Sequence, residues 1–305
     1  YSPPSAILLI PFGYCRWESS IIVWWVLTGA CCCGSGFVSA AMYARVAGRH
    51  DWTWAIVILV VSWCPLTWAT IRSANTSGVT SLMISLCLYG MTTQRSVLTS
   101  FAFYVGAILK FATIPLLVIP IALGRFRILG ILAAASILLT AGVIALTGIG
   151  PWQEYVTLLS TLGRPNLYPV NFSTLGLINQ FIGVDYLEWA LAARRVAMAT
   201  TIVALCVGLR RNRHCDDARV VLAGASASLG WFLLFAPTTQ NHYFAYLFPL
   251  WGYYVAEARY SWLARFASLV IVGGSIIPIG GSSRDLSPLL QSHMIWSAGA
   301  AMVFG

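Results

Sequence analysis

A single lysine lies within a long apolar stretch of this chain, and it is the first residue to consider for chemistry. Lys110 is the only lysine among the 305 residues, and no other charge occurs from Ser96 to Gly124. An ammonium at membrane depth costs about 3 kcal/mol or more, so such a residue normally faces a cavity or a partner instead of lipid. Lys110 is therefore predicted to bind a phosphate or a carboxylate. The alternative is a lysine near a helix end that snorkels to the interface and does nothing else.

Polar side chains also gather late in the chain, just before an apolar run. They are Gln240, Asn241, His242 and Tyr243. Donors and acceptors packed this densely at a helix entrance suit sugar hydroxyls or a phosphate. The alternative is ordinary capping of a helix by Thr239 or Asn241, with Tyr243 and Tyr246 in an aromatic belt at the membrane interface.

Asn75 and Asn171 precede apolar runs in two further loops and are the remaining candidates for binding. Each can cap a helix, and each also matches the N-x-[ST] pattern of glycosylation acceptors. Arg194 and Arg195 could support a lipid phosphate or pair with Asp185 or Glu188. The acidic residues stand in no catalytic motif, and the eight cysteines show no metal-ligand spacing. Phosphate-binding loops and nucleotide-binding motifs are absent from the sequence, so no metal or cofactor is expected.

The elements that position these residues are predicted to be membrane helices. The chain is 59% hydrophobic and only 9% charged, whereas soluble domains carry roughly 25% charged residues. This composition predicts an all-α polytopic membrane protein. Eleven apolar segments are expected, at 19–43, 52–70, 79–91, 97–109, 112–124, 128–149, 188–209, 220–236, 243–259, 266–280 and 290–305. Several are shorter than the roughly 20 residues of a full span, and the pair 97–109 and 112–124 is predicted to break at Lys110.

Arginine positions orient this predicted bundle. Alternate loops contain 11 of the arginines: Arg45, Arg49, Arg95, Arg125, Arg127, Arg210, Arg211, Arg213, Arg219, Arg259 and Arg265. The positive-inside rule assigns these loops to the cytoplasm, and the parity of the segments agrees. The net charge of +9 is thus interpreted as loops that meet anionic lipid headgroups, and nucleic acid is not an expected partner. Lys110 and the loop 150–187 then face outward. The start of this loop is predicted to be an interfacial helix with one face formed by Trp152, Tyr155, Leu158, Leu159 and Leu162.

Five stretches, taken in their order, resemble glycosyltransferase family 87. They are YSPPSAILLIPF from Tyr1 to Phe12, Asn75 in SANTSGVTSLMISL, GAILKFATIPLLVIPIALGRFR from Gly106 to Arg127, PWQEYVTLLS…NFSTLGLINQF from Pro151 to Phe181, and PTTQNHYFAYLFPLW from Pro237 to Trp251. The resemblance implies a GT-C-like bundle of about 11 helices, plus interfacial helices on the outer face. It also implies a single transmembrane domain over residues 1–305, trimmed at both ends, with the first span and first outer loop missing.

The activity that the resemblance implies is transfer of a mannosyl-type sugar, with inversion, from a polyprenyl phosphate to a lipid or glycan hydroxyl. Lys110, Asn75, Asn171 and the stretch from Gln240 to Tyr243 would bind the donor phosphate or sugar. The acidic catalytic base is expected upstream of Tyr1. The protein would lie in a cell membrane, or in the endoplasmic reticulum membrane of a eukaryote, with its site facing outward. Two alternatives stay open: a transporter or flippase of lipid-linked glycans, and a glycan polymerase or ligase.

Overall fold

The computed structural model describes most of the first 257 residues. The described residues are 3–14, 16–48, 75–162, 173–181, 186–215, 217–236, 243, 246–257 and 262. Within these ranges the regular structure is entirely helical, which confirms the predicted all-α membrane fold. Among the described residues, four helices are long and apolar enough to cross a membrane: α2 (Trp17–Ala47), α8 (Phe126–Thr147), α11 (Leu187–Arg211) and α12 (Asp217–Phe235). The segments predicted at 52–70, 266–280 and 290–305 lie outside the described residues.

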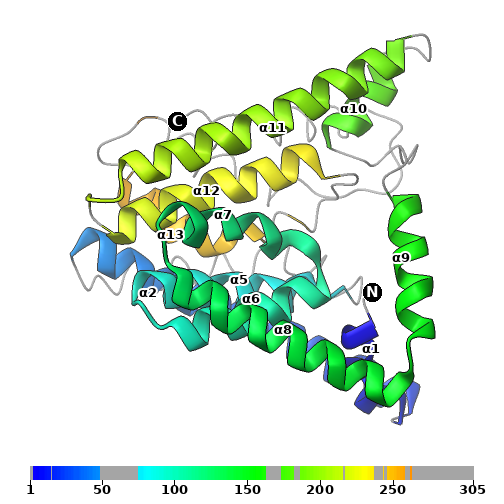
Figure 1. Ribbon diagram of the computed structural model, residues 1–305. Helices are drawn as coiled ribbons and strands as arrows, with labels where there is room; N and C mark the ends of the chain where they lie inside the picture. Colours follow the sequence, from blue (N-terminus) through cyan, green and yellow to red (C-terminus); the bar gives the residue numbers. More distant parts are fainter. Residues whose placement is uncertain are drawn as a thin grey trace, which may run out of the picture.

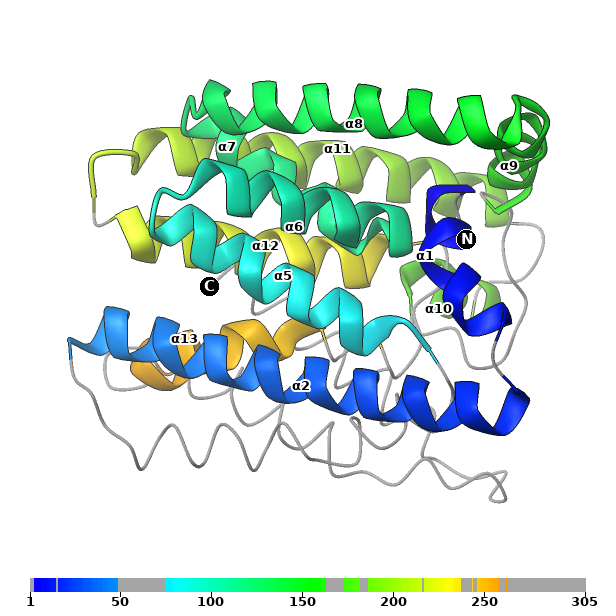
Figure 2. The ribbon, with the colours of Figure 1, turned by 90° about the horizontal axis from the view of Figure 1, so that it is seen from below.

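Helix α5 (Ser77–Thr92) lies at the centre of the bundle, between α2 and α6 (Ser96–Leu109) (Figure 2). Twelve of its 16 residues are buried. Small residues let these helices approach closely, since a Cβ added to Gly78 would come within 2.7 Å of the Thr28 side chain. The Ser35 hydroxyl of α2 also bonds Ser81 and Ser85 of α5, at 3.0 and 2.7 Å. The helix that begins near the predicted site is therefore rigidly held.

The short apolar pair forms a hairpin that breaks at Lys110, as its sequence predicts. Helix α6 ends at Leu109, and the chain returns as the 3₁₀ helix η1 (Phe111–Leu117) and the short α7 (Val118–Ala122). Lys110 between them has an extended backbone, with φ −155° and ψ 143°. The two arms are in contact, because a Cβ at Gly106 would lie 2.5 Å from the Thr113 side chain. This packing fixes the position of the lysine at the turn.

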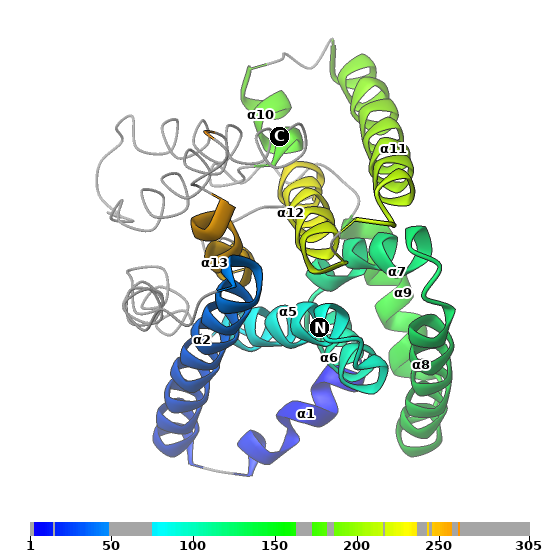
Figure 3. The ribbon, with the colours of Figure 1, turned by 90° about the vertical axis from the view of Figure 1, so that its left-hand side faces the viewer.

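The remaining long helices differ in how much lipid they face. Helix α12 is central, since 78% of the residues in its most apolar 18-residue stretch are buried. The corresponding share is 11% for α8 and 0% for α11. An end-on view shows α8 and α11 at the margin and α12 inside, with α13 (Phe248–Glu257) beside α2 (Figure 3). The exposed leucines and isoleucines of α8 are expected to contact lipid.

The two ends of the bundle differ in composition. The described arginine-containing loops lie at the left of Figure 1. Two helices, α2 and α11, end there, and three helices, α6, α8 and α12, begin there. Lys110 lies toward the opposite end, which α9 (Gly150–Leu162) crosses and where α1 (Pro3–Gly13) packs against α6, α8 and α9. The agreement between arginine positions and helix direction supports the predicted topology, and the assignment of one end to the cytoplasm stays a prediction.

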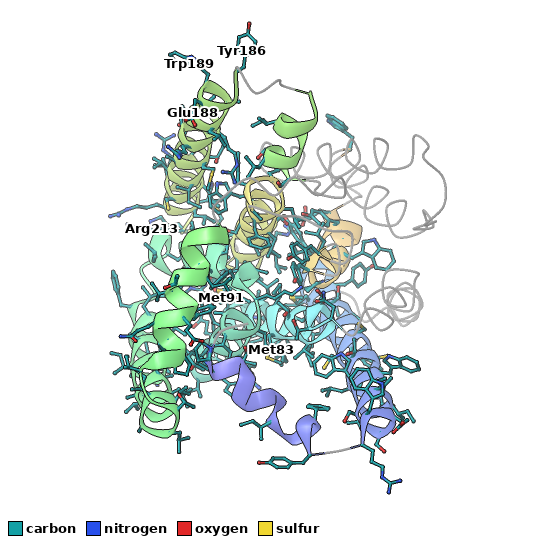
Figure 4. The ribbon with its side chains drawn as sticks, turned by 90° about the vertical axis from the view of Figure 1, so that its right-hand side faces the viewer. Met83, Met91, Tyr186, Glu188, Trp189 and Arg213 are labelled. Carbon is teal, nitrogen blue, oxygen red and sulfur yellow. The ribbon has the colours of Figure 1, made fainter. Side chains whose placement is uncertain are left out.

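The interfacial helix has a narrower inner face than its sequence predicts. Trp152, Tyr155 and Leu159 are half-buried, but Leu158 is 49% exposed. Helix α10 (Thr174–Phe181) follows at the same end of the bundle (Figure 1). In Figure 4, Tyr186 and Trp189 at the start of α11 project away from the bundle, as expected for aromatic side chains at a membrane interface.

Candidate functional site

Lys110 lies where three separate parts of the chain meet. Its ammonium nitrogen donates a hydrogen bond to the hydroxyl of Ser77, the first residue of α5, at 3.0 Å. The same nitrogen lies 4.5 Å from the centroid of the Tyr243 ring, within the range of a cation–π interaction. The lysine side chain is therefore directed back into the bundle, and the side chain is only half-buried. The ammonium therefore does not extend toward the membrane interface, as the snorkelling alternative would require.

The Ser77 hydroxyl connects Lys110 to two further polar groups. It lies 2.9 Å from the side-chain oxygen of Asn75 and 3.3 Å from the hydroxyl of Tyr246. Since an amide oxygen only accepts and an ammonium only donates, the single hydroxyl proton of Ser77 goes to Asn75. The lone pairs of Ser77 are then available to accept from Lys110 and from the Tyr246 hydroxyl. The order of donors and acceptors in this cluster is thus determined by its chemistry.

Asn75 has a capping role at the same time. Its side-chain oxygen also accepts the backbone N–H of Ser77 at 3.1 Å, which satisfies one of the unpaired donors at the start of α5. The contact identifies the oxygen of the amide group, because a backbone N–H needs an acceptor. Asn75 can therefore cap α5 and belong to the polar cluster around Lys110 at the same time.

Aromatic rings form one wall of this cluster. The rings of Tyr243 and Tyr246 stack with centroids 5.3 Å apart, and Phe232 of α12 lies 6.3 Å from each. Tyr246 is completely buried, so the expectation that it belongs to an aromatic belt at the membrane surface is wrong. Its burial follows from its contacts with Ser77 and Phe232, which supply a polar partner and an apolar surface.

A comparison with models of protein families shows to which family the chain belongs. The family model for glycosyltransferase family 87 matches residues 1–237. The chain belongs to glycosyltransferase family 87. No curated protein and no solved structure matches it. The protein is therefore a membrane glycosyltransferase, which uses a sugar donor and an acceptor.

The family match includes Asn75, Ser77 and Lys110, whereas Tyr243 and Tyr246 lie beyond it. The structure thus brings together three residues that the sequence predicts for the site of this glycosyltransferase: Asn75, Lys110 and Tyr243. Their role in binding stays a prediction. The other predicted residues, Gln240, Asn241, His242 and Asn171, lie outside the described residues.

Sequence reasoning missed Ser77 and the hydrogen bond of Tyr246. A weak signal exists for both, since Ser77 is the serine of the N-x-S match at Asn75 and Tyr246 is three residues after Tyr243. Neither spacing indicates these contacts, because Ser77 bonds Lys110 across 33 positions of the chain and Tyr246 across 169.

Arg194 has a different environment from Lys110. Its guanidinium donates to the backbone carbonyl of Phe235 and to the Thr174 hydroxyl, the latter at 3.3 Å. Thr174 in turn donates to the carbonyl of Leu234 at 2.8 Å. The exposed Glu188 is not a partner in these contacts. Arg194 therefore joins α10 and α11 to the end of α12, which is a structural role.

Proposed function

We propose that this family 87 enzyme transfers a mannosyl-type sugar from a polyprenyl phosphate to a lipid or glycan hydroxyl, with inversion, on the outer face of the membrane. The observation that carries the proposal is the cluster of Lys110, Ser77 and Asn75 at the turn of a broken helix pair, beside the Tyr243 ring. A cation at this depth suits a donor whose lipid tail stays in the bilayer and whose phosphate lies near its edge.

The reaction breaks the bond between the anomeric carbon and the phosphate oxygen. The acceptor oxygen forms the new bond on the opposite face of the sugar, and its proton goes to a carboxylate upstream of Tyr1. The phosphate leaves with the bonding electrons and gains negative charge. Lys110, as a nearby ammonium, stabilises that charge in the transition state. His242 assists the departure of the phosphate or positions the sugar.

Ser77 and Tyr243 are positioning residues in this proposal. Ser77 accepts one N–H of the Lys110 ammonium and so holds the nitrogen beside the start of α5. The Tyr243 ring lies over the same nitrogen and restricts its position without offsetting its charge. Asn75 is proposed to bind the donor as well, together with Gln240, Asn241 and Asn171, which lie outside the described residues. Residues 1–305 are proposed to form one domain.

The test is the turnover of radiolabelled polyprenyl-phosphate mannose by full-length protein in membranes. Lys110→Met should lose most activity, and Lys110→Arg should recover only part of it, because a planar guanidinium does not reproduce a point charge. Arg45→Met, an exposed change at the opposite end of the bundle, is the matched control. Unchanged turnover in Lys110→Met at equal expression would remove Lys110 from the mechanism. Movement of intact lipid-linked sugar across the bilayer without transfer would favour a flippase.

A further inference from the structure

A groove separates α11 from α12 toward the arginine-rich end of the bundle. Its volume is about 450 Å³, which lies within the range of small-molecule sites. Its walls are formed mainly by small residues, among them Ala204 and Gly208 of α11 and Ala223 and Ala227 of α12. Small residues often allow two membrane helices to close on one another. Here they leave an open channel, and Ala204 and Ala223 are exposed along it.

The groove runs parallel to the helices. Its lining residues recur every three or four positions on α12, from Val220 to Trp231, a distance of about 16 Å along a helix axis. At the far end the indole N–H of Trp231 donates to the carbonyl of Met198 at 3.2 Å and joins the two helices. Figure 3 shows α11 and α12 side by side, viewed from the arginine-rich end. The groove therefore has the direction of a lipid chain and a defined inner limit.

Polar groups occur mainly at the other end of the groove. Asn212 and Arg219 line it there, and the side chain of Arg219 is 46% exposed although its Nε lies 3.1 Å from a carboxylate oxygen of Glu257. Arg210, Arg211 and Arg213 flank Asn212 in the chain and are exposed. Within the described residues these three make no ion pair, so this end has an excess of positive charge.

We infer that the α11–α12 groove binds an anionic phospholipid. One acyl chain lies along the alanine and glycine walls, and the headgroup phosphate lies between Arg219 and Asn212. Basic pockets between membrane helices are a common form of anionic lipid site. Apolar walls with polar groups at one end match an amphiphile better than a sugar or a nucleotide. The donor is not the expected occupant, because its phosphate belongs at Lys110, near the opposite end of the bundle.

The experiment uses full-length protein purified in a non-ionic detergent and incubated with equal amounts of phosphatidylglycerol and phosphatidylcholine. Native mass spectrometry then counts the lipids that stay bound. Wild-type protein should retain one phosphatidylglycerol in preference to phosphatidylcholine. Arg219→Gln should reduce this preference by about fivefold, as expected for one arginine near a membrane surface. Arg45→Gln, an exposed change at the same end of the bundle, should leave the preference unchanged.

A second pair of variants tests the groove itself. Ala227→Leu adds three carbons to a lining residue and should lower the retention of phosphatidylglycerol, whereas Ala134→Leu on the exposed face of α8 should not. Comparable helix content by circular dichroism would exclude unfolding as the cause. Equal retention of both lipids by the wild type, equal retention by the two leucine variants, or no retained lipid would each overturn the inference. None of these results depends on transferase activity, so the proposed reaction is tested separately.

Discussion

The two ends of the bundle hold their cations by different means. Near one end, the Lys110 ammonium contacts the Ser77 hydroxyl and the Tyr243 ring, and neither group carries a formal charge. Near the other end, Arg125 pairs with the carboxylate of Asp217 and also donates to the carbonyl of Met91 at 2.6 Å. Both arrangements restrict a cationic side chain, but these two contacts of Lys110 are with uncharged groups, whereas Arg125 contacts a carboxylate.

This difference distinguishes the arrangement that we propose for binding the donor from a structural one. A hydroxyl and an aromatic ring position an ammonium without placing a negative charge beside it. The Asp217 carboxylate offsets the charge of the Arg125 guanidinium, and the pair stabilises the junction of α5, α8 and α12. Mutation of Lys110 or of its contacts should therefore change catalysis, and mutation of Arg125 should change stability.

The largest effect is expected for Lys110→Met. Loss of one group that stabilises a developing anion costs roughly 10²–10³-fold in rate. Turnover of polyprenyl-phosphate mannose should fall by this factor, while the thermal midpoint of the purified protein stays close to the wild-type value. A large loss of stability with little loss of rate per folded molecule would reverse the comparison.

Ser77→Ala should come next, because it removes the acceptor that positions the ammonium. A hydrogen bond to a charged group contributes about 1.5–3 kcal/mol, so kcat should fall by roughly tenfold or more. Ser81→Ala, one helical turn further along α5 and bonded to Ser35, is the matched control. Ser77→Cys keeps the size but is a poor acceptor, and it should behave like Ser77→Ala. Equal losses in the two alanine variants would indicate a merely structural role for Ser77.

Arg125→Met tests the other end of the bundle. The Arg125 side chain is 17% exposed and that of Asp217 is 41% exposed, so the pair is partly screened. Loss of its hydrogen bonds should cost about 1–3 kcal/mol of stability and lower the thermal midpoint. Arg127→Met changes an exposed neighbour on the same helix and should have little effect. Turnover per folded molecule should match the wild type in both variants.

The smallest effect is expected at Tyr243. A cation–π contact of a cation that is not fully buried contributes about 0.5–1 kcal/mol, so Tyr243→Leu should lower turnover about two- to fivefold. Tyr243→Phe keeps the ring over Lys110 and should retain most of the activity. If both variants lost activity equally, the hydroxyl would be the important group, and the cation–π interpretation would be wrong.

The sequence predicts the helices of this protein better than the contacts between them. Apolar runs and arginine positions correctly predict the helical fold, the hairpin that breaks at Lys110 and the helix at Gly150–Leu162. These features depend on local hydrophobicity and charge, which a single sequence displays. The contact between Lys110 and Ser77 depends on how α5 packs against the hairpin, and no local pattern contains that information.

Tyr246 also shows that a local sequence pattern does not contain contacts between distant parts of the chain. Two nearby tyrosines before an apolar run are typical of a membrane interface, and that interpretation failed for Tyr246 because a buried hydroxyl partner was present at Ser77. Burial of an aromatic side chain is decided by neighbours from α5 and α12, which lie far away in the chain.

The hairpin also makes the length of α6 a determinant of chemistry. Each residue added to a helix turns everything after it by about 100° and moves it about 1.5 Å along the axis. One residue inserted between Ser96 and Leu109 would therefore rotate Lys110 away from Ser77, even if every side chain in the cluster were retained. In the proposed mechanism, the number of residues in α6 therefore determines where the ammonium lies. A deletion in this apolar helix should then lower turnover about as much as the loss of Lys110.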